Sequence, residues 1–147
     1  FYLENNMAEG NMVLDGVRID LSKVKIPIFD LAAREDHIAP AISVFRGAKL
    51  FGDSIEYVLA GSGHIAGVIN PPDADRIKYQ FWTNPGLAAS ATLEDWMAGA
   101  TETPGSWWDY WADWLGKKSG GMIPARTPGQ NFEPIEDAPG SYVRVKS

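Results

Sequence analysis

Apolar residues form two short runs that are typical of buried strands. Residues 25–33 are entered through Pro27, and residues 55–60 end at a Gly-Ser-Gly sequence. Continuous apolar runs of this length occur in parallel sheets, where both faces are covered. Between them, residues 40–51 begin with a proline and are followed by Gly52, a pattern that marks a helix. The order strand, helix, strand predicts a βαβ unit with a parallel sheet and a right-handed crossover.

Weaker patterns predict further elements around this unit. Residues 13–21 alternate loosely around a glycine, as in a short hairpin or an extended connection. Residues 78–83 are expected to form a short strand or a loop. Residues 93–100 suit a short helix, with Thr92 and Asp95 at the spacing of a capping box.

A tryptophan-rich helix is predicted after Ser106, with Asp109 completing a variant capping box and with its end at Gly116 or Gly120. Three tryptophans share one face of this helix: Trp107, Trp111 and Trp114. A stripe at this spacing usually packs into a core or a subunit interface, and an aromatic platform for a ligand is the alternative.

Composition narrows the class of protein. The chain has 147 residues, 13 Lys+Arg against 19 Asp+Glu and a formal net charge of −6, which disfavours an electrostatic nucleic-acid binder. Six Trp, five Tyr and six Phe carry too much apolar surface for a disordered chain. Neither a membrane-spanning run of ~18 apolar residues nor a signal peptide is expected. Because the sequence does not start with Met, we expect a processed chain or part of a longer one.

Two residues of complementary acid–base character follow the two predicted strands. Asp36 lies just beyond the first strand, and His64 lies just beyond the second, 28 residues later. Ligands of parallel sheets gather at the carboxyl ends of the strands, and a triad needs a carboxylate to fix the tautomer of its histidine. The order acid, then histidine, is that of an α/β-hydrolase. The alternative is that Asp36 caps the helix near Pro40 and that His64 is an ordinary loop residue.

The nucleophile of such a triad is missing from these residues. No serine has a Gly-x-Ser-x-Gly context, and the chain has no cysteine. Either the triad hypothesis is wrong, or this is the C-terminal part of a longer α/β-hydrolase. His37 and His64, the two histidines, belong to different predicted loops, so no metal site is expected. His37 is expected at a partly exposed helix start.

Five segments together resemble the C-terminal region of class I poly(3-hydroxyalkanoate) synthases. The resemblance covers essentially the whole chain, and one departure is Ala41, where the family usually has Trp. The segments are Phe-Tyr-Leu-Glu-Asn-Asn at 1–6, Ala-Arg-Glu-Asp-His-Ile-Ala-Pro at 33–40, Gly-Ser-Gly-His-Ile-Ala-Gly-Val-Ile-Asn-Pro-Pro at 61–72, Gly-Ser-Trp-Trp at 105–108 and Ala-Pro-Gly-Ser-Tyr-Val at 138–143.

The resemblance implies a function and a site. Such enzymes polymerise (R)-3-hydroxyacyl-CoA into polyester at cytoplasmic storage granules, through a cysteine that would lie upstream of this segment. His64 matches the general base, and Asp36 matches the acid that orients it. The CoA thioester is a substrate, and no cofactor or metal is implied. Residues 1–23 would connect from a cap segment, and residues 24–147 would form late strands and helices of the α/β-hydrolase core.

The implied partners are the N-terminal part of the same enzyme, a second copy in a homodimer and the granule surface, with no nucleic acid and no membrane span. As an isolated chain it would lack the nucleophile and be inactive. Two other hypotheses remain open. One is a polyester depolymerase or esterase with an upstream nucleophile. The other is a non-catalytic aromatic-rich interaction module, in which Asp36 and His64 would face apart and the tryptophan helix would be exposed.

Overall fold

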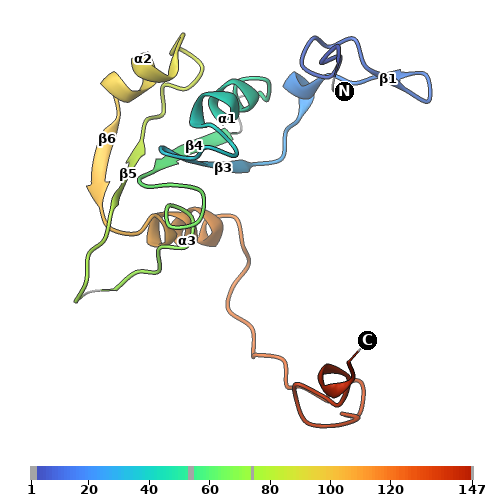
Figure 1. Cartoon of the computed structure of the whole chain (residues 1–147). Coiled ribbons are helices and arrows are strands. Elements are labelled where there is room, and N and C mark those ends of the chain that lie inside the picture. Colours follow the sequence, from blue (N-terminus) through green and yellow to red (C-terminus); the bar gives the residue numbers. More distant parts are fainter. Residues whose placement is uncertain (1–2, 53–54, 74, 147) are drawn as a thin grey trace. The chain divides into compact units, whose positions relative to one another are not determined.

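A four-stranded mixed sheet forms the centre of the fold (Figure 1). The computed structural model describes residues 3–52, 55–73 and 75–146, so that positions 1 and 2 of the first matching segment lie outside the described residues. The strands lie in the order β3-β4-β5-β6. Their bounds are Ile28–Ala33 for β3, Ile55–Ala60 for β4, Gln80–Thr83 for β5 and Thr101–Pro104 for β6.

The predicted βαβ unit is present. Strands β3 and β4 pair in parallel, with Ala33 opposite Ala60, and helix α1 (Ala41–Ala48) connects them. The expectation of a parallel sheet is wrong beyond this pair, because β5 is antiparallel to β4 and β6 is antiparallel to β5. The chain between β4 and β5 forms turns rather than the crossover helix that a parallel return requires.

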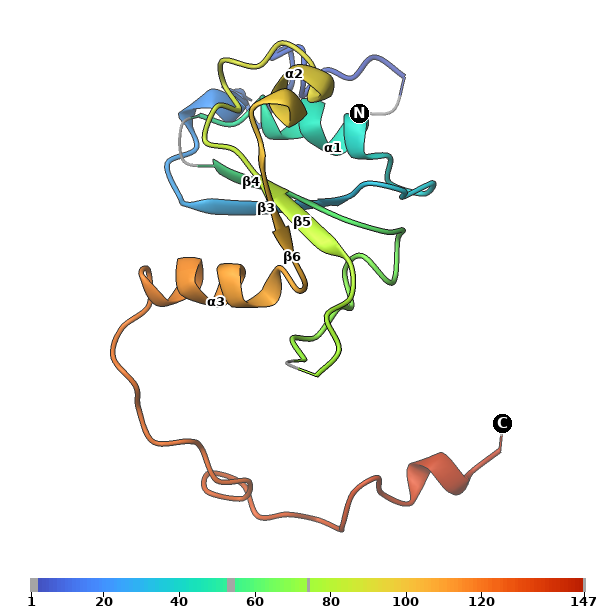
Figure 2. The ribbon, with the colours of Figure 1, turned by 90° about the vertical axis from the view of Figure 1, so that its left-hand side faces the viewer.

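Helices cover both faces of the sheet (Figures 1 and 2). Helices α1 and α2 (Leu93–Ala98) lie on one face, and α3 (Trp108–Gly116) lies on the other. Because side chains alternate along a strand, Tyr57 of β4 faces α1 and α2. Its ring makes edge-on contacts with Phe45 and Trp96, at centroid distances of 5.6 and 4.9 Å. These three rings form the centre of the main core.

The opposite face packs against α3 through aromatic rings. Phe29 of β3 stacks on Trp107 with centroids 6.0 Å apart and meets the edge of Trp114 at 5.4 Å. Tyr110 packs against Phe81 of β5. The expected burial of the tryptophan stripe is therefore only partly correct, because Trp111 on the same helix is 40% exposed.

One of the two capping boxes predicted from the sequence is present. Thr92 and Asp95 form a complete capping box at α2, as expected. The capping box predicted at α3 is wrong: the helix begins at Trp108, and no side-chain cap is present. The Ser106 hydroxyl instead accepts a hydrogen bond from the Trp108 N–H at 3.0 Å, closing a local turn.

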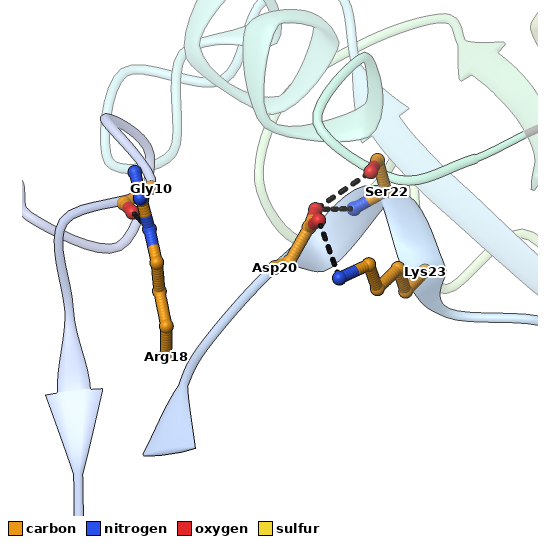
Figure 3. Close-up of polar contacts among 5 residues, drawn as sticks. All are labelled: Gly10, Arg18, Asp20, Ser22 and Lys23. Carbon is orange, nitrogen blue, oxygen red and sulfur yellow. Dashed lines mark hydrogen bonds and ion pairs between the residues drawn. The ribbon is translucent and has the colours of Figure 1, made fainter. Parts of the chain in front are cut away.

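The N-terminal segment contains the expected hairpin, β1 (Val13–Leu14) and β2 (Val17–Arg18). Its two central residues both have positive φ, as in a type I′ turn. A short 3₁₀ helix follows at Leu21–Lys23, where the Asp20 carboxylate accepts from the Ser22 N–H and hydroxyl and pairs with Lys23 (Figure 3). The Arg18 guanidinium donates to the Gly10 carbonyl (Figure 3).

Residues 118–147 form a separate unit with a 3₁₀ helix at Tyr142–Arg144. Within it, the Glu136 carboxylate accepts from the N–H and hydroxyl of Ser141, at 2.8 and 3.1 Å. Exposed apolar side chains are frequent there, and they include Met122, Ile123, Phe132 and Ile135.

The aromatic core predicts the response to truncation on α1. Phe45 is 2% exposed, and its replacement by Ala should lower the free energy of unfolding by about 3–5 kcal/mol, because the ring leaves a cavity beside Tyr57. Ile42→Ala on the same helix is the matched control, since Ile42 is 41% exposed and should cost much less. Urea unfolding followed by circular dichroism measures both, and equal losses would contradict this packing.

Candidate active site

The site begins where the two parallel strands end. Beyond β3 and β4 the backbone pairing continues: the Arg34 N–H donates to the Ala60 carbonyl at 2.8 Å, and the Glu35 N–H donates to the Ser62 carbonyl at 2.9 Å. Ser62 has φ of 67°, which turns the chain sharply after β4. Two turns, one carrying Asp36 and one carrying His64, are thus held side by side at one edge of the sheet.

Asp36 builds its own turn. Its Oδ1 accepts hydrogen bonds from the N–H groups of Ile38 and Ala39, at 2.8 and 2.9 Å. Its own N–H donates to the Ala33 carbonyl at 3.2 Å. These bonds fix the carboxylate plane and leave Oδ2 for another partner. Asp36 therefore orders the turn before α1. Contrary to the alternative, it does not cap that helix, because the N-cap position is Pro40 and no side chain caps it.

The other carboxylate oxygen meets His64. The distance from His64 Nδ1 to Asp36 Oδ2 is 2.8 Å. The carboxylate is largely enclosed, with 6% of the Asp36 side chain exposed, whereas the imidazole is 44% exposed. The contact expected from the sequence is present, and the requirement of the interaction-module hypothesis that the two residues face apart is not met.

Hydrogen bonding determines the charge of Asp36 and, through it, the tautomer of His64. The Ala39 N–H and then the imidazole and the Ile38 N–H lower the pKa of Asp36 from its ordinary 3.8 to about 2, against the opposing effect of desolvation. An ionised carboxylate can only accept hydrogen bonds, so Nδ1 of His64 must carry the proton. In the neutral ring this leaves Nε2 as the basic nitrogen, the arrangement of a general base.

The turn that carries His64 is tightly packed. The N–H of Gly67 donates to the Gly63 carbonyl at 2.9 Å, and the N–H of Ile69 donates to the Ile65 carbonyl at 2.7 Å. A side chain at Gly67 would collide with its surroundings, since a Cβ there would lie 2.5 Å from the Gly61 carbonyl oxygen and 3.0 Å from the Ala33 Cβ. Glycine is therefore required where this turn lies against the end of β3.

Two tryptophans at the start of α3 donate hydrogen bonds to the turn that carries His64. The indole N–H of Trp107 donates to the Gly67 carbonyl at 3.1 Å, and that of Trp108 donates to the Val68 carbonyl at 3.0 Å. Next along the chain, the buried Asn70 amide donates to the Lys78 carbonyl at 3.0 Å. The donor residues belong to the segments 61–72 and 105–108 that resemble the synthases, but no sequence pattern indicated these hydrogen bonds.

His37 and Ala41, two further residues considered from the sequence, lie outside the acid–histidine contact. His37 is exposed beside Asp36, but it lies three residues before the N-cap Pro40 and not at the helix start that was expected. Ala41, at the departure from the family pattern, is 7% exposed at the start of α1, and its carbonyl lies 3.4 Å from the Tyr57 hydroxyl that donates to it. The small side chain at this position belongs to the main core, as does Tyr57.

Neither a metal site nor a membrane-spanning helix is found among the described residues, and a cleft lies apart from the acid–histidine pair. Among them, no group of three or more His, Cys, Asp or Glu side chains is arranged to hold a metal ion. No helix in the described part of the chain has the length and apolarity to cross a membrane. A cleft of about 560 Å³ lies between α3 and residues 70–73 and 76–78. It is lined by both basic and acidic side chains, and neither Asp36 nor His64 belongs to it.

Fold and site together define a mixed α/β protein with an acid–histidine pair at the carboxyl edge of two parallel strands. No family model matches the chain. A poly(3-hydroxyalkanoate) polymerase of Methylorubrum extorquens is 56% identical over 147 residues, covering 99% of this chain and 24% of the relative. A polymerase subunit of Rhizobium meliloti is 53% identical over 99% of this chain and 23% of the relative. One of Cupriavidus necator is 39% identical over 99% of this chain and 25% of the relative.

The chain is related over nearly its whole length to the poly(3-hydroxyalkanoate) polymerases, which confirms the resemblance seen in the motifs. It spans about a quarter of the length of these curated relatives. All three relatives carry the name of a polymerase, and none of them is named as a depolymerase or an esterase.

The hydrogen bonds to Asp36 predict an unusual titration. The Asp36 carboxyl carbon, followed by NMR, should titrate near pH 2, and His64→Ala should raise that midpoint only part of the way to 3.8, because the Ala39 N–H makes the largest contribution. The pKa is lower in the folded chain, so the associated stability is present above about pH 4 and lost as the pH falls toward 2. A wild-type midpoint near 3.8, or complete recovery in His64→Ala, would contradict this geometry.

Proposed function

We propose that this chain supplies the general base and the orienting acid of a poly(3-hydroxyalkanoate) polymerase with an α/β-hydrolase fold. The observation that carries the proposal is the 2.8 Å hydrogen bond from His64 Nδ1 to an ionised Asp36, which makes Nε2 the basic nitrogen. The relation to polymerases of three bacteria supports the choice of reaction.

The proposed reaction is acyl transfer in two stages. Nε2 of His64 takes the proton of a cysteine thiol from elsewhere in the intact enzyme, and the thiolate attacks the thioester carbonyl of (R)-3-hydroxyacyl-CoA. The C–S bond to CoA breaks, and the proton passes from His64 to the departing thiolate, giving free CoA and an acyl-enzyme thioester. The 3-hydroxyl of a second acyl group then attacks the carbonyl of the acyl-enzyme thioester, and Nε2 of His64 receives the hydroxyl proton. The C–S bond to the cysteine breaks as the ester bond forms, and the proton passes from His64 to the departing cysteine thiolate, which restores the free thiol.

Asp36 contributes in this scheme without changing its own charge. Its carboxylate holds the Nδ1–H tautomer and stabilises the imidazolium that forms during each transfer. The remaining parts of the proposal follow the resemblance: a homodimer, an N-terminal part that carries the cysteine, and a cytoplasmic location at polyester granules.

A chimeric enzyme tests the assignment. This chain replaces the matching residues of the Methylorubrum extorquens polymerase, and release of CoA from (R)-3-hydroxybutyryl-CoA measures the activity. His64→Gln should lower kcat by at least about 100-fold, because the proton acceptor is lost. Asp36→Asn should also lower it by at least about 100-fold, because an amide can donate to Nδ1 and thereby favours the wrong tautomer.

His37→Gln is the matched control for the chimera, because this neighbouring imidazole is exposed and has no role in the scheme. It should retain the parent activity. An active His64→Gln variant, or a parent chimera without activity, would argue against the proposal.

The isolated chain gives an independent test. Because it contains no cysteine, it should release no CoA from (R)-3-hydroxybutyryl-CoA above the buffer rate. A thiol-reactive dye measures the release. Turnover by the isolated chain at a rate that His64→Gln reduces would show that the nucleophile lies within these residues, contrary to the proposal.

A further inference from the structure

We propose that Trp107 and Trp108 are positioning residues, which hold the His64 turn in place through their indole N–H groups. The catalytic consequence of this inference rests on the proposed function, whereas the hydrogen bonds themselves are properties of this chain. The two indoles donate to consecutive carbonyls, those of Gly67 and Val68, three and four residues after His64 (3.1 and 3.0 Å).

The turn has little side-chain packing of its own to fix its position. His64 is 44% exposed at the side chain, Ile65 is 72% exposed, and Gly67 has no side chain. Its internal hydrogen bonds shape the turn, but they do not attach it to the rest of the fold. Besides the hydrogen bond from His64 to Asp36, contacts made through the backbone of the turn therefore decide where the imidazole lies relative to the sheet.

Helix α3 is a firm support for these donors. The ring of Trp107 stacks on Phe29 of β3, so the indole is anchored to the strand that leads to Asp36. One turn further along α3, the Tyr110 hydroxyl donates to Glu56 of β4 at 2.6 Å, which ties the helix to the strand that leads to His64. In Figure 1 the green loop that follows β4 passes beside α3.

The chemistry of indole suits this role. Its N–H is a donor only, on a rigid ring with two side-chain torsions, so it can fix a carbonyl without competing for the proton of His64. The two rings also meet edge to face, with centroids 6.3 Å apart. Each tryptophan thus limits the freedom of the other, and the pair resists rotation of the turn about a single bond.

Phenylalanine substitutions separate the hydrogen bonds from the packing. Trp107→Phe, Trp108→Phe and the double variant are made in the full 147-residue chain, which needs no nucleophile for this test. NMR follows the Nδ1–H proton of His64, and amide exchange follows Gly67, Val68 and Ile69. We expect exchange at these amides to rise about fivefold for each bond removed, and the Nδ1–H signal to broaden or shift most in the double variant.

Trp96→Phe is the matched control. Its indole also donates to a carbonyl, that of Asn84 at 3.1 Å, but Trp96 points from α2 into the main core, away from the turn. It should lower global stability and leave the Nδ1–H signal of His64 unchanged. If the double variant fails to fold, Trp108→Phe alone and Gly67→Ala, which displaces the same turn through its Cβ, should show the same spectroscopic change.

Kinetics of the chimera provide the functional arm. Trp108→Phe should lower kcat about 10-fold or more with little change in KM, since a misplaced base affects the transfer and not the binding of substrate. Unchanged exchange and Nδ1–H signals in the double variant, or the same signal change in Trp96→Phe, would overturn the inference. An active His64→Gln chimera would overturn the proposed function and leave the NMR result on the tryptophans standing.

Discussion

Parallel pairing of β3 and β4 is the constraint on which the site depends. With Ala33 opposite Ala60, both strands finish at the same edge, and the chain beyond them stays paired for two further bonds. A slip of one residue would turn every side chain of β3 to the other face, removing Phe29 from α3. The same register therefore fixes the meeting of Asp36 with His64 and the packing of the helix that supports the second turn.

The two halves of the pair are held by different means. Asp36 uses one carboxylate oxygen to organise its own turn and the other to bind the imidazole, so that its position and its charge share one cause. His64 lies on a turn whose backbone carbonyls accept hydrogen bonds from the two tryptophans at the start of α3. A rigid acid and a supported but half-exposed histidine suit a site that must receive its third group, and its substrate, from outside these residues.

The sequence predicted what depends on short-range patterns. Apolar runs, Pro40 and Gly52 indicated β3, α1 and β4, and the residues beyond the strand ends indicated the acid–histidine contact. Strand β6 was missed because all four of its residues are exposed and it carries no apolar signal. The antiparallel pairing of β5 and the indole bonds depend on packing between distant segments, and the start of α3 follows a local turn at Ser106 that does not form the expected capping box. Tryptophans at helical spacing indicated a face but not the carbonyls that their N–H groups would find.

Strand β3 is an edge strand of the four-stranded sheet among the described residues, paired on one side with β4. Its six residues belong to the strand that leads to Asp36, and they offer a row of backbone donors and acceptors along the outer side of the sheet. Such an open margin is a template for any extended segment that can reach it. In a longer polypeptide, a strand added there would complete the sheet. Without such a strand, the exposed edge of β3 favours pairing between two copies of this chain.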